Sequence, residues 1–308
     1  MAAVEHTVVE ERRWQAIGAL SAVSAFGLWA VLPIYFNLFG PGVSSWEILL
    51  HRVVWAAVAL ALYTLGAGRA ARVRALLARR RALLALTVSA AAIGGNWATF
   101  IWAVTHGEIL QSSLGYYINP LLSVFLGFCF LGERLRMVQL LAVLIAAGGV
   151  GYMIIGFGEV PWLALLLAGF FGLYGLIRKQ VDVDSATGLL AETTILLPVA
   201  LGWLVLLQLR GEAVFLGGGA RIDLLLIGAG VVTLFPLLLF AVAARRLRLA
   251  TVGLIQYIAP TGHLLIGVFL YGEPFTRADA VTFTCIWLGL ALYTADLWRQ
   301  QRRPAVGS

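Results

Sequence analysis

YYINPLLSVFLGFCFLGERL, at residues 116–135, is the stretch that decides the fold, because it occurs a second time in the chain. Residues 256–275 read QYIAPTGHLLIGVFLYGEPF, and the two stretches align without a gap at an offset of 140 residues. Earlier in the chain, FGLW at residues 26–29 recurs as FGLY at residues 171–174, at an offset of 145 residues. Two matches in the same order, each separated by about half the chain, indicate an internal duplication.

The composition is that of a protein embedded in a lipid bilayer. The chain is 61% hydrophobic and 12% charged, with a mean hydropathy of +0.92, whereas an ordinary soluble domain has about 25% charged residues. Its apolar residues form ten blocks of about 20 residues, the length that a helix needs to cross about 30 Å of hydrocarbon. We therefore predict an all-α integral membrane protein with ten transmembrane helices, at residues 14–37, 44–66, 82–104, 109–131, 135–156, 160–178, 186–208, 222–244, 249–271 and 277–298.

The basic charge of the chain follows membrane topology rather than nucleic-acid binding. The net charge is +7 and the isoelectric point is about 9.8. With the N-terminus in the cytoplasm, the outside segments contain only Arg210, Arg221 and Arg277, Arg52 lies within a helix, and the remaining Lys and Arg residues lie in inside segments. This asymmetry is the positive-inside pattern. Both termini are therefore expected in the cytoplasm, and no nucleic-acid partner is expected.

An odd number of helices in each copy gives the two copies opposite orientations in the membrane. We predict a first repeat at residues 14–156 and a second at residues 160–298, five helices each, with cytoplasmic tails at residues 1–13 and 299–308. The polar tail at residues 1–13 is expected to be disordered. Inverted repeats of this kind are common in secondary transporters, whose substrate site lies near the midplane where the halves meet.

Polar side chains inside the predicted helices mark a candidate cavity, because lipid rejects them. In the fourth block, polar residues recur at helical spacing and form one stripe, with Tyr116 and Asn119 at its centre. The predicted cavity residues are His51, Arg52, Asn96, Trp97, Tyr116, Tyr117, Asn119, Gln256, Tyr257 and His263. The alternatives are an Arg52 that reaches outward or ties helices together, tyrosines that only pack between helices, and a structural, hydrogen-bonded His263.

Glu47 and Glu192 are the acids that lie well inside helices, and they occupy equivalent positions at the offset of 145 residues. A carboxylate in a low-dielectric site can exchange a proton near neutral pH. We predict Glu192 as the main proton carrier, assisted by Glu47 or His51. Glu192 ranks first because it lies deeper and has no basic residue within one turn. The alternatives are that Glu192 only holds its helix in place, or that the protein is a passive facilitator.

Two further predictions concern the prolines inside the expected helices and the catalytic motifs that the sequence lacks. We predict helix kinks at Pro33, Pro120, Pro236 and Pro260, since proline removes a ladder hydrogen bond. The chain contains no HExxH, Walker A, GxSxG or paired CxxC motif. It therefore predicts no enzyme, no metal site and no cofactor.

The chain contains several motifs at characteristic spacing: EILLHR at residues 47–52, GGNWATFIWAV at 94–104, SLGYYINPL at 113–121, FLGERLR at 130–136 and QYIAP at 256–260. Together they resemble the RarD family, the EamA-repeat branch of the drug/metabolite transporter superfamily, over residues 14–298. The resemblance implies a multi-pass protein of the bacterial inner membrane, with two inverted EamA repeats around a central cavity and alternating access. His263 stands where the resemblance leads us to expect an apolar residue.

The sequence thus predicts a secondary active transporter that exports a small metabolite or drug by alternating access and is coupled to protons. Its expected partners are a small-molecule substrate, the lipid bilayer and protons; nothing in the sequence indicates a homodimer, which stays open. A membrane-embedded transferase acting on lipid is one alternative, and a helper or sensor that transports nothing is another.

Overall fold

The computed structural model describes residues 2–40, 42–105, 109–158, 160–272 and 275–302. All regular structure within these ranges is helical. The helices are α1 (Ala2–Asn37), α2 (Ser45–Gly66), α3 (Ala70–Leu77), α4 (Arg80–Thr105), α5 (Ile109–Leu131), α6 (Met137–Phe157), α7 (Trp162–Gln180), α8 (Ser185–Leu209), α9 (Ala220–Arg246), α10 (Leu249–Ile255), α11 (Ile258–Leu270) and α12 (Arg277–Arg302).

In the described part of the chain, ten spans are long and apolar enough to cross a membrane. Eight spans fall within single helices other than α3, the ninth combines α10 with α11, and the tenth is α12. Large apolar side chains on their outer surfaces are exposed, as on Leu62, Phe125 and Phe269. Such a surface is stable in lipid and unstable in water. The predicted all-α membrane fold with ten transmembrane segments is therefore confirmed.

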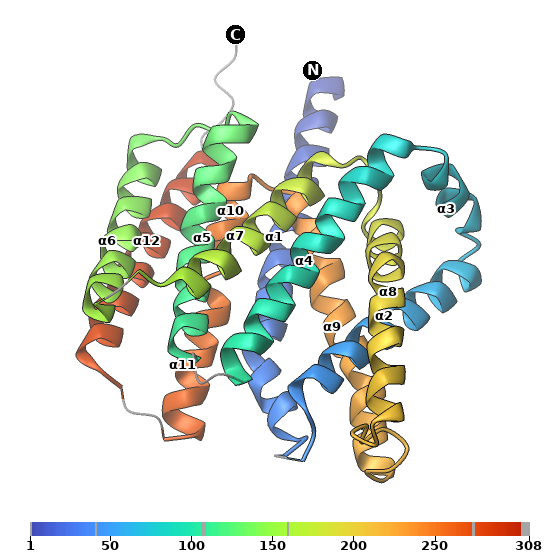
Figure 1. Ribbon diagram of the computed structural model, residues 1–308. Coiled ribbons are helices and arrows are strands. Elements are labelled where there is room, and N and C mark those ends of the chain that lie inside the picture. Colours follow the sequence, from blue (N-terminus) through green and yellow to red (C-terminus); the bar gives the residue numbers. More distant parts are fainter. Residues whose placement is uncertain (1, 41, 106–108, 159, 273–274, 303–308) are drawn as a thin grey trace.

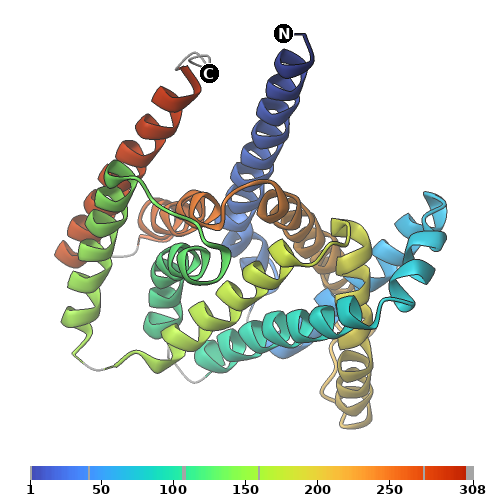
Figure 2. The same cartoon turned by 90° about the horizontal axis from the view of Figure 1, so that it is seen from above.

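Seen from above, α10, α1 and α9 form one row of helices, and α5, α7 and α4 form a second row that faces it (Figure 2). At one edge α6 packs against α12, and at the other α2 packs against α8. Between these edges α5 contacts α7 and α10, α1 contacts α9 and α11, and α4 contacts α7. The start of α1, the end of α12 and α3 lie on one face, which we call the α3 face (Figure 1). The ends of α1 and α11 lie on the opposite face.

The predicted start of the first helix is wrong. Helix α1 begins at Ala2, so the segment 1–13 that was predicted to be disordered is helical from its second residue. The reason is that the chain has neither glycine nor proline before Gly18 to end a helix. The connection between α2 and α4 contains the short helix α3.

The predicted single helix at residues 249–271 is broken in the middle. Pro260 has no N–H, and its ring is incompatible with the helical position of the Gln256 carbonyl four residues earlier. That carbonyl instead accepts a hydrogen bond from the Ala259 N–H at 3.0 Å, in a tighter turn. The equivalent Pro120 lies within the continuous helix α5. The two halves of the protein therefore differ at this position.

The other prolines lie inside long helices. Pro33 is in α1 and Pro236 is in α9, whereas Pro260 is in the first turn of α11. A further proline that was not predicted, Pro198, lies inside α8. Each interior proline removes one ladder hydrogen bond, so the kinks remain a prediction about these helices.

Candidate substrate cavity

A cavity of about 470 Å³ lies among the central helices, and helices from both halves of the chain line it. Its volume is in the range of about 300–1,000 Å³ that is usual for small-molecule sites. Most of the wall is apolar or aromatic, from residues that include Phe26, Trp29, Phe36, Trp97, Phe100 and Phe171. The polar side chains of the wall are Arg52, Asn96, Tyr116, Tyr117, Asn119, Thr233, Gln256, His263 and Tyr271.

All of the predicted cavity residues except His51 and Tyr257 line this cavity. His51 is turned away by about 100° from Arg52, the angle between successive helical residues. Its Nδ1 accepts a hydrogen bond from Trp55 at 3.1 Å, and its ring lies 4.5 Å from the ring of Phe215. His51 therefore belongs to the packing between α2 and the segment after α8.

Tyr257 is fully buried at the junction between α10 and α11. Its hydroxyl donates a hydrogen bond to the Tyr117 carbonyl in α5 at 3.2 Å. The ring packs in a cluster with Leu254 and Ile286. Tyr257 thus connects the junction of α10 and α11 to α5, behind the cavity wall. Spacing along the sequence does not distinguish this packing role from a role in lining the cavity.

Arg52 lies in the wall, with its guanidinium between two aromatic rings. The guanidinium carbon is 5.3 Å from the centre of the Phe36 ring and 5.2 Å from that of Trp97. Each such cation–π contact contributes about 0.5–2 kcal/mol. Nε of Arg52 donates to Thr233 Oγ1 at 2.7 Å, and Thr233 in turn donates to the Ala229 carbonyl at 2.7 Å. Arg52 therefore faces the cavity and also connects α2 to α9.

His263 contacts α1 and α5 from the far side of the cavity. Its Nε2 lies 3.0 Å from the Trp29 carbonyl oxygen, and its ring meets that of Tyr116 edge-on, with 5.5 Å between the ring centres. The ring is thus hydrogen-bonded and still borders the cavity. His263 therefore borders the cavity, as predicted, and is also held by a hydrogen bond, as in the structural alternative.

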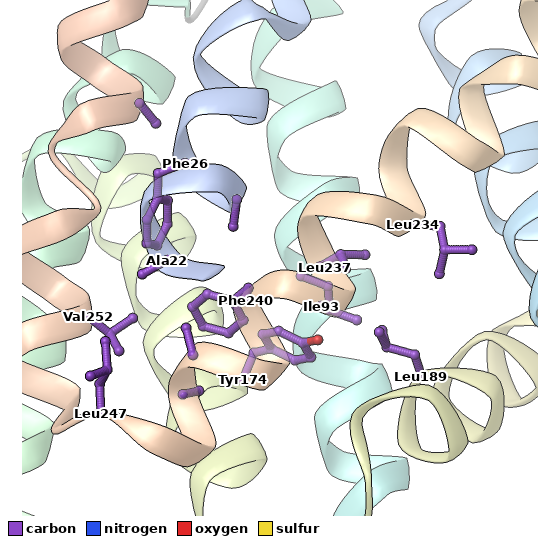
Figure 3. Close-up of a cluster of buried hydrophobic side chains, with 14 of the residues drawn as sticks. Ala22, Phe26, Ile93, Tyr174, Leu189, Leu234, Leu237, Phe240, Leu247 and Val252 are labelled. Atoms are coloured by element: carbon purple, nitrogen blue, oxygen red, sulfur yellow. The ribbon is translucent and has the colours of Figure 1, made fainter. Parts of the chain in front are cut away.

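A stack of aromatic side chains lies at the end of the cavity nearer the α3 face, and Figure 3 labels three of its members, Phe26, Tyr174 and Phe240. The Phe240 ring lies 5.2 Å from Phe171, 5.6 Å from Tyr174 and 6.1 Å from Phe26, measured between ring centres. These residues come from α1, α7 and α9. Toward the opposite face the wall continues through Phe36 and Tyr271, near the ends of α1 and α11.

Beyond this aromatic stack, Glu133 holds α5 to the start of α10. Its carboxylate accepts hydrogen bonds from the Leu249 and Ala250 N–H groups at 2.6 and 3.0 Å. Lys179 and Arg248 lie 3.9 and 4.0 Å away as ion-pair partners. Sequence reasoning assigned Glu133 no role, although its identity in both repeats was a signal that could have pointed to it.

Glu192 lies outside the cavity wall, in a buried cluster that joins three helices. Ser89 donates a hydrogen bond to its Oε1 at 2.6 Å, and Nη1 of Arg178 lies 3.6 Å from the same oxygen. We expected Arg178 in a cytoplasmic segment, but its side chain is only 1% exposed. A side chain at position 188 would collide with its guanidinium, so Gly188 makes room for it. The sequence did not reveal Arg178 as the partner of Glu192, because Arg178 belongs to the preceding helix.

Glu47 also lies outside the cavity and is completely buried. Its carboxylate accepts hydrogen bonds from the Val214 and Phe215 N–H groups at 2.8 and 2.9 Å. Glu47 thus holds the connection between α8 and α9 against α2. Among the residues that the structure describes, no cluster of three or more His, Cys, Asp or Glu side chains could hold a metal ion.

Comparisons with known proteins identify the family. Residues 16–155 match the EamA-like transporter family. Protein RarD of Escherichia coli (strain K12) is 43% identical over 286 residues, which cover 93% of this chain and 96% of the relative. The chain belongs to the RarD family of EamA-type transporters. An uncharacterized transporter of Vibrio cholerae is 46% identical over 279 residues, covering 91% of this chain and 92% of its own.

A solved crystal structure shares the fold of this RarD-family chain. Its TM-score is 0.65 at 18% sequence identity, and the match covers 90% of this chain and 97% of the other. The matching family model is one of transporters, and the relative from Vibrio cholerae is named a transporter. The chain is therefore a multi-pass membrane transporter and not an enzyme.

Proposed function

We propose that this transporter moves one small organic molecule at a time by alternating access through the 470 Å³ cavity. The observation that carries the proposal is the position of the lining residues, which in α1 and α11 extend from the middle of the helix toward the face opposite the α3 face. The aromatic stack around Phe240 and the Glu133 contacts lie between the cavity and the α3 face. The wall reaches the opposite face at Phe36 and Tyr271. A cavity that extends toward one face is expected in one state of an alternating-access cycle.

The packing of the helices supports two inverted repeats as the moving halves. Three contacts join helices in equivalent positions of the two halves: α6 with α12, α5 with α10 and α2 with α8. The contact of α1 with α9 corresponds to that of α7 with α4, and α1 with α11 corresponds to α7 with α5. If the two halves exchanged their conformations, the cavity would close toward the opposite face and open toward the α3 face.

The direction and energy source are part of the proposal. The Arg-rich segments, α3 among them, support an orientation with the α3 face toward the bacterial cytoplasm, by the positive-inside rule. We propose export driven by a proton gradient, with Glu192 as the carrier. Protonation would release Arg178 and loosen α7 against α8. The close contacts of Glu192 with Arg178 and Ser89 favour a second role, in which Glu192 only holds α8 in place.

The test begins with purified protein. A thermal-shift screen of metabolites and drugs identifies a ligand, since a ligand stabilises the state that it binds. Liposomes containing the protein should then exchange that ligand across the membrane. A ligand that binds and never crosses would contradict the transport proposal and favour a helper or sensor.

The proton proposal is tested in the same liposomes. An imposed pH gradient should accelerate uphill movement by the wild-type protein, and Glu192→Gln should abolish this acceleration while preserving exchange. Wild-type transport that ignores the pH gradient shows that proton coupling is wrong. A Glu192→Gln protein that loses stability and keeps the pH response shows that Glu192 only holds α8.

A further inference from the structure

The described part of the cavity wall contains a cation and no anion. Among the lining residues that the structure describes, Arg52 is the only Lys or Arg, and none is Asp or Glu. Its Nε donates to Thr233. Within the described part of the chain, neither of its terminal nitrogens, Nη1 and Nη2, makes a hydrogen bond or an ion pair. The guanidinium thus keeps its two outermost nitrogens for a group in the cavity.

The buried guanidinium of Arg178 differs from that of Arg52 because it has an anionic partner. Arg178, in α7, has Glu192 at 3.6 Å and donates to the Ser185 carbonyl. Among the described residues, Arg52 contacts the neutral Thr233 and the faces of two aromatic rings, and it has no ion-pair partner. A charge in a low-dielectric site is stable when an opposite charge or several hydrogen bonds compensate it. The bound molecule is the partner that is left to supply this compensation.

Unpaired amide oxygens give a second, independent sign of a ligand. Asn119 Oδ1 and Gln256 Oε1 are buried atoms without a hydrogen-bond partner among the described residues, and both side chains line the cavity. Each side chain is only 4% exposed. Buried acceptors are normally satisfied in proteins. A ligand with a hydroxyl or N–H group would satisfy them.

The rest of the wall selects the body of the ligand. Trp29, Trp97, Phe100 and Phe171 present aromatic surface to the cavity. Flat apolar groups pack well on such surfaces. One guanidinium matches the two oxygens of one carboxylate in a bidentate pair, and it repels a cation.

We infer that the substrate is an organic monocarboxylate with a flat apolar body and a hydrogen-bond donor, and that Arg52 binds its carboxylate. This inference rests on the proposed transport through the same cavity. The carboxylate pairs with Nη1 and Nη2, the body lies against the aromatic wall, and the donor meets Asn119 or Gln256. Arg52 therefore sets the charge that the transporter accepts.

Equilibrium binding to purified protein tests the inference with compounds of one shape and different charge. The probes are phenylacetate, its neutral amide phenylacetamide, the cation phenethylamine, and mandelate, which adds a hydroxyl group to phenylacetate. Wild-type protein should bind phenylacetate at least about tenfold more tightly than phenylacetamide, as expected for a charge-assisted bidentate pair. Phenethylamine should bind more weakly still, and mandelate more tightly than phenylacetate.

Variants of Arg52 test whether this residue causes the preference for the carboxylate. Arg52→Gln should remove the preference for phenylacetate over phenylacetamide, and Arg52→Lys should keep part of it, because the charge remains and the planar fork is lost. The matched control is Arg210→Gln, at an exposed arginine that follows α8 outside the cavity. It should bind all four probes as the wild type does. The wild-type comparison needs no variant, so it decides the question even if Arg52→Gln does not fold.

Specific outcomes overturn the inference. Equal binding of phenylacetate and phenylacetamide to the wild-type protein does so, and so does tighter binding of phenethylamine or no binding of any probe. A preference for phenylacetate that survives Arg52→Gln removes Arg52 from the assignment. If phenylacetate binds as stated and liposomes carry none of the probes, the transport proposal fails and the anion site stands. If liposomes carry phenethylamine and phenylacetate has no advantage, the anion site fails and transport stands.

Discussion

Single carboxylates hold the ends of helices and connections in this protein. Glu133 binds the first two N–H groups of α10, and Glu47 binds two N–H groups after α8. Asp184 caps α8 by accepting a hydrogen bond from the Thr187 N–H at 3.2 Å. Backbone N–H groups at such positions have no partner within the helix. An ionised acceptor satisfies them with stronger hydrogen bonds than a neutral one.

Replacement of Glu133 should therefore lower stability. Glu133→Gln removes the charge that faces Lys179 and Arg248 and turns one acceptor oxygen into a donor. The expected loss is about 1–3 kcal/mol, seen as a lower unfolding temperature in detergent. Glu212→Gln, at an exposed acid between α8 and α9, is the control and should leave the unfolding temperature unchanged. Equal unfolding temperatures for both variants would contradict the capping role.

Asp184 should add a pH dependence to the folding stability. Burial alone would raise its pKa, but the hydrogen bonds from Thr187 and the nearby charges of Arg72 and Arg69 outweigh burial and hold the pKa below its ordinary value. A lowered pKa in the folded state stabilises the protein above the unfolded pKa of about 3.9, and this contribution is lost as the pH falls through the folded value.

The comparison of Asp184→Asn with the wild type isolates this charge, since asparagine still caps a helix. The wild type should unfold at a higher temperature than the variant at neutral pH, and the difference should shrink at the most acidic pH that both proteins tolerate. A difference that stays constant across this range would assign the effect to hydrogen bonding alone.

At the scale of helices, small residues bring the backbones into contact. A Cβ added at Gly230 in α9 would lie 2.6 Å from the Ala56 backbone nitrogen in α2. One added at Gly253 in α10 would lie 2.7 Å from the Pro120 carbonyl oxygen in α5, and one at Gly289 in α12 would lie 2.6 Å from the Ala142 carbonyl oxygen. Backbone atoms cannot move aside as a flexible side chain can. Close helix packing in lipid depends on such sites.

Gly230→Ala should consequently destabilise the protein. The new methyl group forces α9 away from α2, at a cost of about 1–3 kcal/mol. The matched control is Gly202→Ala in α8, where nothing lies within 4 Å of the added Cβ. That change should be neutral or slightly stabilising, because alanine favours a helix over glycine by about 1 kcal/mol. Thermal unfolding of the two variants measures the difference; a loss at position 202 equal to that at 230 would rule out the packing explanation.

At the scale of the whole molecule, the cavity separates two faces that differ in charge. The α3 face has Arg69, Arg72 and Arg74 in and beside α3, and Arg245 and Arg246 at the end of α9. The opposite face has few basic residues in its connections. Arginine-rich segments stay on the cytoplasmic side during membrane insertion. The proposed orientation, and with it the direction of transport, depends on this difference.

Cysteine labelling on intact cells measures the orientation. In a Cys129→Ala, Cys285→Ala background, Gly217→Cys between α8 and α9 should react with a membrane-impermeant thiol reagent, because this connection is expected outside. Ala71→Cys in α3 should react only after the cells are opened. Labelling of position 71 but not 217 on intact cells would reverse the topology and the direction of export.

The sequence by itself determined the class, the helices and the family of this protein. Length and hydropathy are local properties, so ten apolar blocks became ten membrane spans with boundaries close to those expected. Two members of the polar stripe of α5, Tyr116 and Asn119, line the cavity, as expected for polar side chains that lipid disfavours.

Only the tertiary structure decided which polar groups meet. Arg52 faces the cavity while its neighbour His51 packs elsewhere, because the rotation of α2 about its axis depends on the helices around it. Glu192 is paired with Arg178 from α7 rather than free in the cavity. The depth of a side chain in the membrane follows from its position along the helix. The direction in which it points around the helix, and its partners from distant segments, depend on how the helices pack together. For that reason the residues were foreseeable and their contacts were not.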